Sequence, residues 1–124
     1  MTVSQQNIEM VSGDSRRIHI NGVRDQDARY DDSVVDLVGA QLRWGVLDRK
    51  GGDVLLTKRT ENAGGARAEI NVVDPKDGEV YIYLDPSDTE TMAGRYYHEL
   101  EMEDVSGMVS TLMNGYLDIA RDSI

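Results

Sequence analysis

The sequence predicts an all-β protein, an antiparallel immunoglobulin-like β-sandwich of seven to nine strands. Short runs of alternating apolar and polar residues recur at a spacing of roughly 8–12 residues, as in sandwich folds. Turn-forming Gly, Pro and Asp residues separate these runs. The chain has 124 residues, enough for one hydrophobic core. We therefore expect a single domain over residues 1–124, with flexible ends at 1–5 and 120–124.

The clearest strand pair is a hairpin near the C-terminus. Its first strand alternates two kinds of side chain, with Tyr96, His98, Leu100 and Met102 facing the core and Tyr97, Glu99, Glu101 and Glu103 facing solvent. After a polar turn at 104–107, the return strand (108–119) places its inward register at Val109, Thr111, Met113, Gly115, Leu117 and Ile119. A helix also fits residues 112–120, but Gly115 inside it costs about 1 kcal/mol relative to Ala, which favours the strand.

A corner precedes this hairpin. Pro86 cannot donate to a strand ladder, and Ser87 or Asp88 can begin a short helical turn near residues 87–92. Gly94, followed two residues later by Tyr96, resembles a tyrosine corner, which makes Tyr96 a predicted core residue. A register slip of one residue would put Tyr97 there instead and would turn three glutamates inward.

Further strands are expected earlier in the chain, over residues 6–12, 16–20, 34–39, 41–46, 54–60, 67–73 and 79–84. Trp44 lies on the inward side of its strand, between Leu42 and Val46. A single Trp on an early strand of a sandwich fills the core, so Trp44 is predicted to be a core residue. A ligand-stacking role for Trp44 is the alternative.

The charge of the chain excludes some partners. A net charge of −10 and a pI near 4.5 argue against nucleic acid, which requires a basic surface. No apolar run approaches the roughly 20 residues of a membrane span, and residues 1–10 do not resemble a signal peptide, so no membrane partner is expected.

The types of charged residue indicate the salt concentration in which the protein works. Asp outnumbers Glu by 15 to 8, and three lysines stand against ten arginines. Short carboxylates and few long lysine stems suit a surface in concentrated salt, which screens self-repulsion. We predict a protein from a high-salt environment; an ordinary acidic protein is the other interpretation.

The residues needed for chemistry are sparse. The chain has no cysteine, His19 is predicted to face outward, and His98 is predicted to be a core histidine satisfied by the backbone rather than a catalytic base. The loop from Asp25 to Asp32 lacks the central Gly and closing Glu of a calcium loop, although cation binding there stays open. We expect no enzyme activity, no cofactor and no metal. Tyr81, Tyr83 and Tyr97 are instead predicted to form an outward aromatic patch and candidate partner surface.

Four segments in order, GDSRRIHI, VDLVGAQLRWGV, GGDVLLTKRT and VVDPKDGEVYIYLDPSDTETMAGRYYHELEMEDVSGMVSTLMNGYLDI, carry a family resemblance over residues 13–119. They resemble the immunoglobulin-like N-terminal domain of tailed-phage upper baseplate proteins and related small tail proteins. The resemblance implies a virion module that oligomerises or docks attachment proteins, without cofactor or catalysis. The long C-terminal extension of upper baseplate proteins is absent from this sequence, which puts their attachment role in doubt.

Together these observations predict a non-enzymatic structural protein of a tailed virus, located in the virion as a tail or baseplate assembly module. Its expected partners are other virion proteins and further copies of itself, and the high-salt surface suggests a halophilic archaeal host. The alternatives are a capsid decoration protein and a glycan-binding attachment module that uses Trp44 or the tyrosines.

Overall fold

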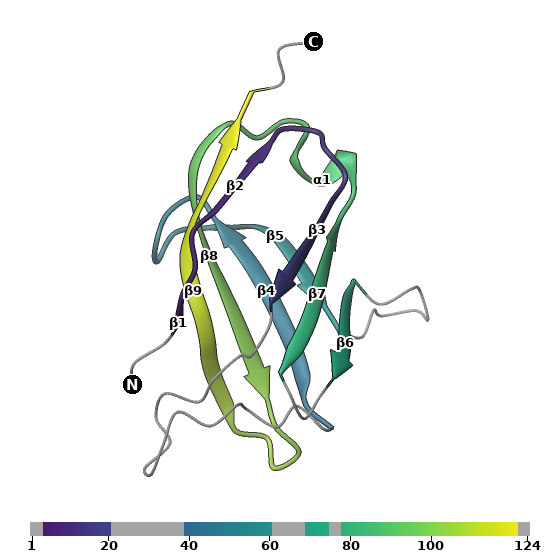
Figure 1. Ribbon diagram of the computed structural model, residues 1–124. Coiled ribbons are helices and arrows are strands. Elements are labelled where there is room, and N and C mark those ends of the chain that lie inside the picture. Colours follow the sequence, from purple (N-terminus) through teal and green to yellow (C-terminus); the bar gives the residue numbers. More distant parts are fainter. Residues whose placement is uncertain (1–3, 21–38, 61–68, 75–77, 122–124) are drawn as a thin grey trace.

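The computed structural model describes residues 4–20, 39–60, 69–74 and 78–121, and it confirms the predicted all-β sandwich. This part of the chain has nine strands, which form two sheets, and one short helix. Figure 1 shows the two layers, with β3, β7 and β6 side by side in one layer and β4, β8 and β9 in the other.

The larger sheet has the order β1-β9-β8-β4-β5, and β2 also pairs with β9. Its strands are β1 (Ser4–Gln5), β2 (Ile8–Val11), β4 (Gln41–Leu47), β5 (Val54–Arg59), β8 (Gly94–Glu103) and β9 (Val109–Ala120). The predicted hairpin is its centre, because β8 pairs antiparallel with β9 on one side and with β4 on the other. Residues 112–120 form a strand rather than the competing helix.

The smaller sheet has the order β3-β7-β6, with all pairs antiparallel. Its strands are β3 (Arg16–Ile20), β6 (Ile70–Asp74) and β7 (Glu79–Leu84), and the helix α1 (Pro86–Thr89) follows β7. The helix begins one residue before the predicted turn, at Pro86, and Asp85 donates its backbone N–H to Asp88 Oδ2 at 2.7 Å. This bond satisfies one of the backbone groups that a helix end leaves unpaired.

The core lies between the sheets and follows the period-2 pattern of the strands. Trp44, Val46 and Leu100 from the larger sheet are fully buried, as are Val80 and Ile82 from the smaller one. The described part of the structure has no buried side-chain nitrogen or oxygen without a hydrogen-bond partner. The sandwich is therefore held by apolar burial with its internal polar groups satisfied.

The N-terminal strands depart from the predicted antiparallel pattern. Both β1 and β2 run parallel to β9, with Ser4 opposite Met113 and Ile8 opposite Leu117. Ser4 and Gln5, within the predicted flexible end 1–5, lie in β1, and Ala120, the first residue of the predicted flexible end 120–124, ends β9. The ladder along β9 thus gives backbone partners to residues near both ends of the chain.

The inward register predicted for β9 is wrong in its first half. Leu100 pairs with Met113, whereas Glu101 pairs with Thr111, so Leu112 is the extra residue of a β-bulge. Side chains before the bulge therefore point to the opposite face from the one predicted, and Val109 is 62% exposed. Residues 34–38 of the strand predicted over 34–39 lie outside the described residues, as does the loop Asp25–Asp32, where cation binding was left open.

Candidate interaction face

The outer face of the smaller sheet carries a row of stacked rings. The antiparallel register sets His19 of β3 opposite Tyr81 of β7, and Arg17 opposite Tyr83. The His19 and Tyr81 rings stack with centroids 4.5 Å apart, and the Tyr81 and Tyr83 centroids are 6.5 Å apart. The Arg17 guanidinium lies 4.4 Å from the Tyr81 ring centroid, within cation–π range. We call Arg17, His19, Tyr81 and Tyr83, together with Glu79, the aromatic face.

This face combines apolar area with a small charge. Arg17 and His19 are exposed, and Tyr81 and Tyr83 are half-buried on the outer side of β7. At the start of β7, Glu79 Oε1 lies 3.5 Å from His19 Nε2. Aromatic rings and arginine are enriched where proteins contact one another, so this surface suits recognition of a partner. The roles of Arg17 and His19 were not predicted, because the sequence alone does not show which β3 residues lie opposite the tyrosines.

Tyr97 does not belong to this face, which corrects the predicted three-tyrosine patch. It lies on β8 in the other sheet and is only 6% exposed. As a central strand, β8 places Tyr97 between its register partners Leu47 and Tyr116. Its hydroxyl donates to Glu99 Oε1 at 2.8 Å, and burial together with this bond raises the pKa of Tyr97 to about 12.

Trp44 lies in the core and forms a buried chain of hydrogen bonds with His98 and the backbone of Gln6. It is 0% exposed, and its indole Nε1–H donates to Nδ1 of His98 at 3.1 Å. Because Nδ1 accepts this bond, the proton of neutral His98 is on Nε2, which lies 2.6 Å from the backbone oxygen of Gln6. Burial lowers the pKa of His98, although the bond to Gln6 opposes this shift. Both ring nitrogens of His98 are thus engaged, and buried Trp44 is closed to a stacking ligand.

Tyr96 marks the corner before β8. Its ring is half-buried against the core, and its hydroxyl lies 3.1 Å from both the backbone N–H and the backbone oxygen of Ala93. The phenol therefore bonds backward to the preceding segment, as in a tyrosine corner.

Lys58 is a buried cation that sequence reasoning did not recognise. Its side chain is 4% exposed, and its ammonium lies 2.8 Å from Asp88 Oδ2 and 3.3 Å from Glu69 Oε2. Burial acts to lower the pKa of Lys58, but the hydrogen bonds and charges of Asp88 and Glu69 together raise it, so the ammonium stays charged at neutral pH. The cluster joins β5 to α1 and to the residue before β6, which makes it a clamp between the sheets.

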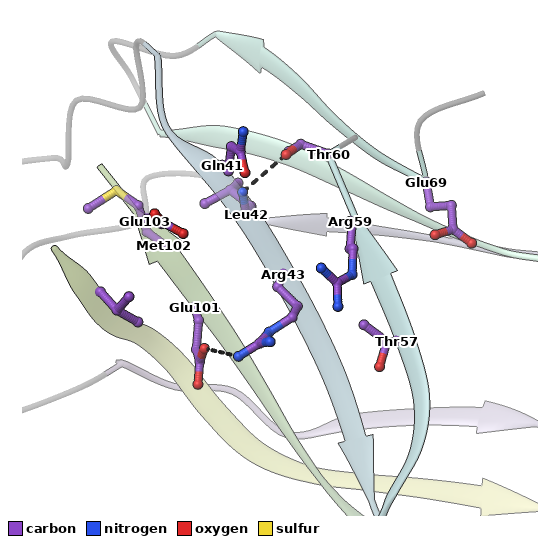
Figure 2. A pocket seen from close by; sticks show the side chains of 11 residues that line it. Gln41, Leu42, Arg43, Thr57, Arg59, Thr60, Glu69, Glu101, Met102 and Glu103 are labelled. Atoms are coloured by element: carbon purple, nitrogen blue, oxygen red, sulfur yellow. Dashed lines mark hydrogen bonds and ion pairs between the residues drawn. The ribbon is translucent and has the colours of Figure 1, made fainter. Parts of the chain in front are cut away.

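A polar recess opens beside β4 and β5 (Figure 2). Arg43 and Arg59 are register partners on these strands, and Arg43 Nη2 donates to Glu101 Oε2 at 2.6 Å. Thr60 Oγ1 accepts the backbone N–H of Leu42 at 3.1 Å. Arginines, acids and threonine hydroxyls line the recess, and no histidine is among its lining residues. It therefore lacks the hydroxyl–imidazole pair of nucleophilic catalysis.

Where the structure describes the chain, no three His, Cys, Asp or Glu side chains are placed to hold a metal ion together. In the part of the chain that the structure describes, no helix is both long enough and apolar enough to cross a bilayer.

Comparisons with known proteins leave the family open. No protein-family model matches the chain, and no curated protein matches it. Among solved structures, the chain is similar to AggA, the major subunit of aggregative adherence fimbriae type I from Escherichia coli, at 11% identity and a TM-score of 0.35. The alignment covers 95% of this chain and 91% of that one. At this TM-score the likeness supports no conclusion about function.

Proposed function

We propose that the chain is a non-enzymatic structural protein of a tailed virion, a tail or baseplate module that binds neighbouring virion proteins and copies of itself. The supporting observation is the aromatic face, where an arginine and three rings lie together on a regular sheet surface. The chemically versatile groups that are buried, His98 and Lys58, are engaged in internal bonds. Together these observations support a recognition surface on a fixed scaffold.

The scaffold suits a module that must hold its shape in an assembly. The β8–β9 hairpin forms the centre of the larger sheet, and the Lys58 clamp ties that sheet to α1. A rigid sheet presents its side chains with little loss of conformational entropy on binding. The surplus of short carboxylates supports the second part of the proposal, a virus of a halophilic archaeal host.

The direct test is the presence of the protein in virus particles. Particles purified from a producing high-salt culture are analysed by quantitative mass spectrometry and labelled with gold-conjugated antibodies against this chain. We expect several copies per particle and label on the tail or baseplate. Label on the head would support a capsid decoration protein instead. Absence of the protein from purified particles would contradict a virion role.

A glycan-binding attachment module is the second candidate, because exposed tyrosine rings can also stack on sugars. Trp44 is fully buried, so this role would rest on tyrosines at the surface, of which Tyr81 and Tyr83 lie together on one face. A glycan array compares the native chain with Y81S/Y83S and with Y116S, a control that removes a 43% exposed tyrosine from the other sheet. Glycan binding lost only in Y81S/Y83S would favour this candidate.

A further inference from the structure

We propose that the aromatic face pairs with the same face of a second copy of this chain, related by a two-fold axis that lies between the faces and runs across the strands. This inference rests on the proposed function and names the partner of its contact surface. Isologous dimers of this kind are the commonest symmetric assemblies of soluble proteins.

The orientation follows from the charges along the face. Glu79 begins β7, whereas Arg17 lies opposite Tyr83 near the other end of that strand. The face therefore has an acidic end and a basic end, with the Tyr81 ring between them under the Arg17 guanidinium. Rotation about an axis across the strands reverses the strand direction. It sets Arg17 of each copy at the level of Glu79 of the other, and the two Tyr81 rings meet in the middle.

The charge balance of the face also suits self-association. The chain carries a net charge of −10, so two copies repel each other over much of their surface. On the aromatic face, however, the charges of Arg17 and Glu79 cancel. The outer side of β8 instead presents Glu99, Glu101 and Glu103. Two copies can thus bring the aromatic faces together without stacking like charges, and the two complementary contacts fix the orientation.

Charge exchange tests this geometry. Sedimentation velocity at about 0.15 M KCl, where the Debye length is near 8 Å, measures the dimer dissociation constant. We expect R17E and E79R each to weaken self-association by about tenfold or more, because each places two like-charged pairs in the dimer. An equimolar mixture of R17E and E79R should regain association as a heterodimer, and the double variant R17E/E79R should regain it alone.

Control variants and a second measurement of self-association at high salt complete the test. R95E changes an arginine on the opposite sheet that pairs with Asp118 at 2.8 Å, and it should leave the dimer unchanged. At roughly 3 M KCl, where charges are screened to within a few Å, Y81S/Y83S should be monomeric while Y116S dimerises. Circular dichroism confirms that each variant is folded. If the native chain unfolds at low salt, the comparison of Y81S/Y83S with Y116S at high salt shows whether the aromatic face forms the dimer.

Three results would overturn the inference: a native chain that is monomeric in both salts, a mixture of R17E and E79R that does not associate, or a Y81S/Y83S variant that still dimerises. A monomer that is nevertheless abundant in purified particles would refute only the pairing with a second copy. A dimer that is absent from particles would refute only the virion role.

Discussion

The buried histidine is the most specific single residue of the core. His98 accepts from the indole of Trp44 and donates to the backbone of Gln6, so its neutral form with the proton on Nε2 fits the site. A proton added to Nδ1 would face the indole N–H, and two donors would oppose each other. Folding therefore favours neutral His98, in agreement with the pKa that burial lowers.

The pH dependence of stability follows from this preference. The unfolded chain binds a proton at His98 near pH 6.5, whereas the folded chain binds it only at lower pH. The free energy of unfolding should therefore fall as pH drops from about 7.5 to about 5.5. Urea titrations of the native chain and H98Q measure this, and H98Q should lose most of the slope. H19Q controls for removal of an exposed imidazole. Equal slopes in the native chain and H98Q would contradict the preference of the fold for neutral His98.

The ion pairs of Lys58 lead to a second prediction for a single residue. K58M removes the ammonium and leaves Asp88 and Glu69, whose side chains are 15% and 30% exposed, without their shared cation. We expect a loss of about 2 kcal/mol, less than for a fully buried pair because both carboxylates reach water. K50M, at an exposed lysine, should change stability by less than about 0.5 kcal/mol. Chemical denaturation at pH 7 compares the two, and equal effects would refute the clamp.

Lys58 and Tyr97 also show which features of a side chain's surroundings the sequence does not predict. Alternation along β5 places Lys58 on the same side as Leu56, but its acceptors lie 11 and 30 residues further along the chain, at Glu69 and Asp88. Tyr97 followed the predicted alternation and points away from the core, yet it is buried by neighbours on its own outer face. Periodicity gives the direction of a side chain but not what the adjacent strands place beside it.

At the scale of elements, the N-terminal strands depend on a glycine in β9. A Cβ on Gly115 would overlap the backbone oxygen of Gln6, the atom that His98 contacts. Gly115 is also the register partner of His98. The absence of a side chain here lets the segment between β1 and β2 approach the buried imidazole.

Replacing this glycine should loosen the N-terminal strands. We expect G115A to destabilise the fold by about 2 kcal/mol, because the added methyl group must push Gln6 away from β9. G45A is the matched control, since a Cβ at that β4 position meets its nearest neighbour at an ordinary 3.9 Å. Hydrogen exchange should show faster exchange in β1 and β2 for G115A alone. Unchanged protection of residues 4–11 in G115A would contradict this role.

Most strands were predictable, and the exceptions have physical causes. The patterns at 16–20, 41–46 and 79–84 match β3, β4 and β7 closely, because each strand has one core face and one wet face. The bulge at Leu112 was not predicted, since two consecutive apolar residues fit either a bulge or an uninterrupted register. The parallel pairing of β1 and β2 depends on long-range contact with β9, which no local signal encodes.

At the scale of the whole molecule, the charge makes a prediction about salt. A net charge of −10 on 124 residues repels itself at low ionic strength, and KCl screens this repulsion. The melting temperature (Tm) should rise by roughly 5 °C or more between about 0.1 and 3 M KCl, a stabilisation of about 1 kcal/mol. Differential scanning calorimetry measures this change. A flat or falling Tm would refute the high-salt origin and leave the ordinary acidic protein.

If the aromatic face is the contact surface of the assembled protein, the reactivity of its tyrosines changes on assembly. Nitration by tetranitromethane, followed by peptide mass spectrometry, compares the dilute protein with the assembled one. We predict that Tyr81 and Tyr83 are nitrated in the dilute protein and protected on assembly. Tyr116, 43% exposed on the other sheet, should react in both states, and buried Tyr97 in neither. Equal nitration of Tyr81 and Tyr83 in both states would contradict the claim.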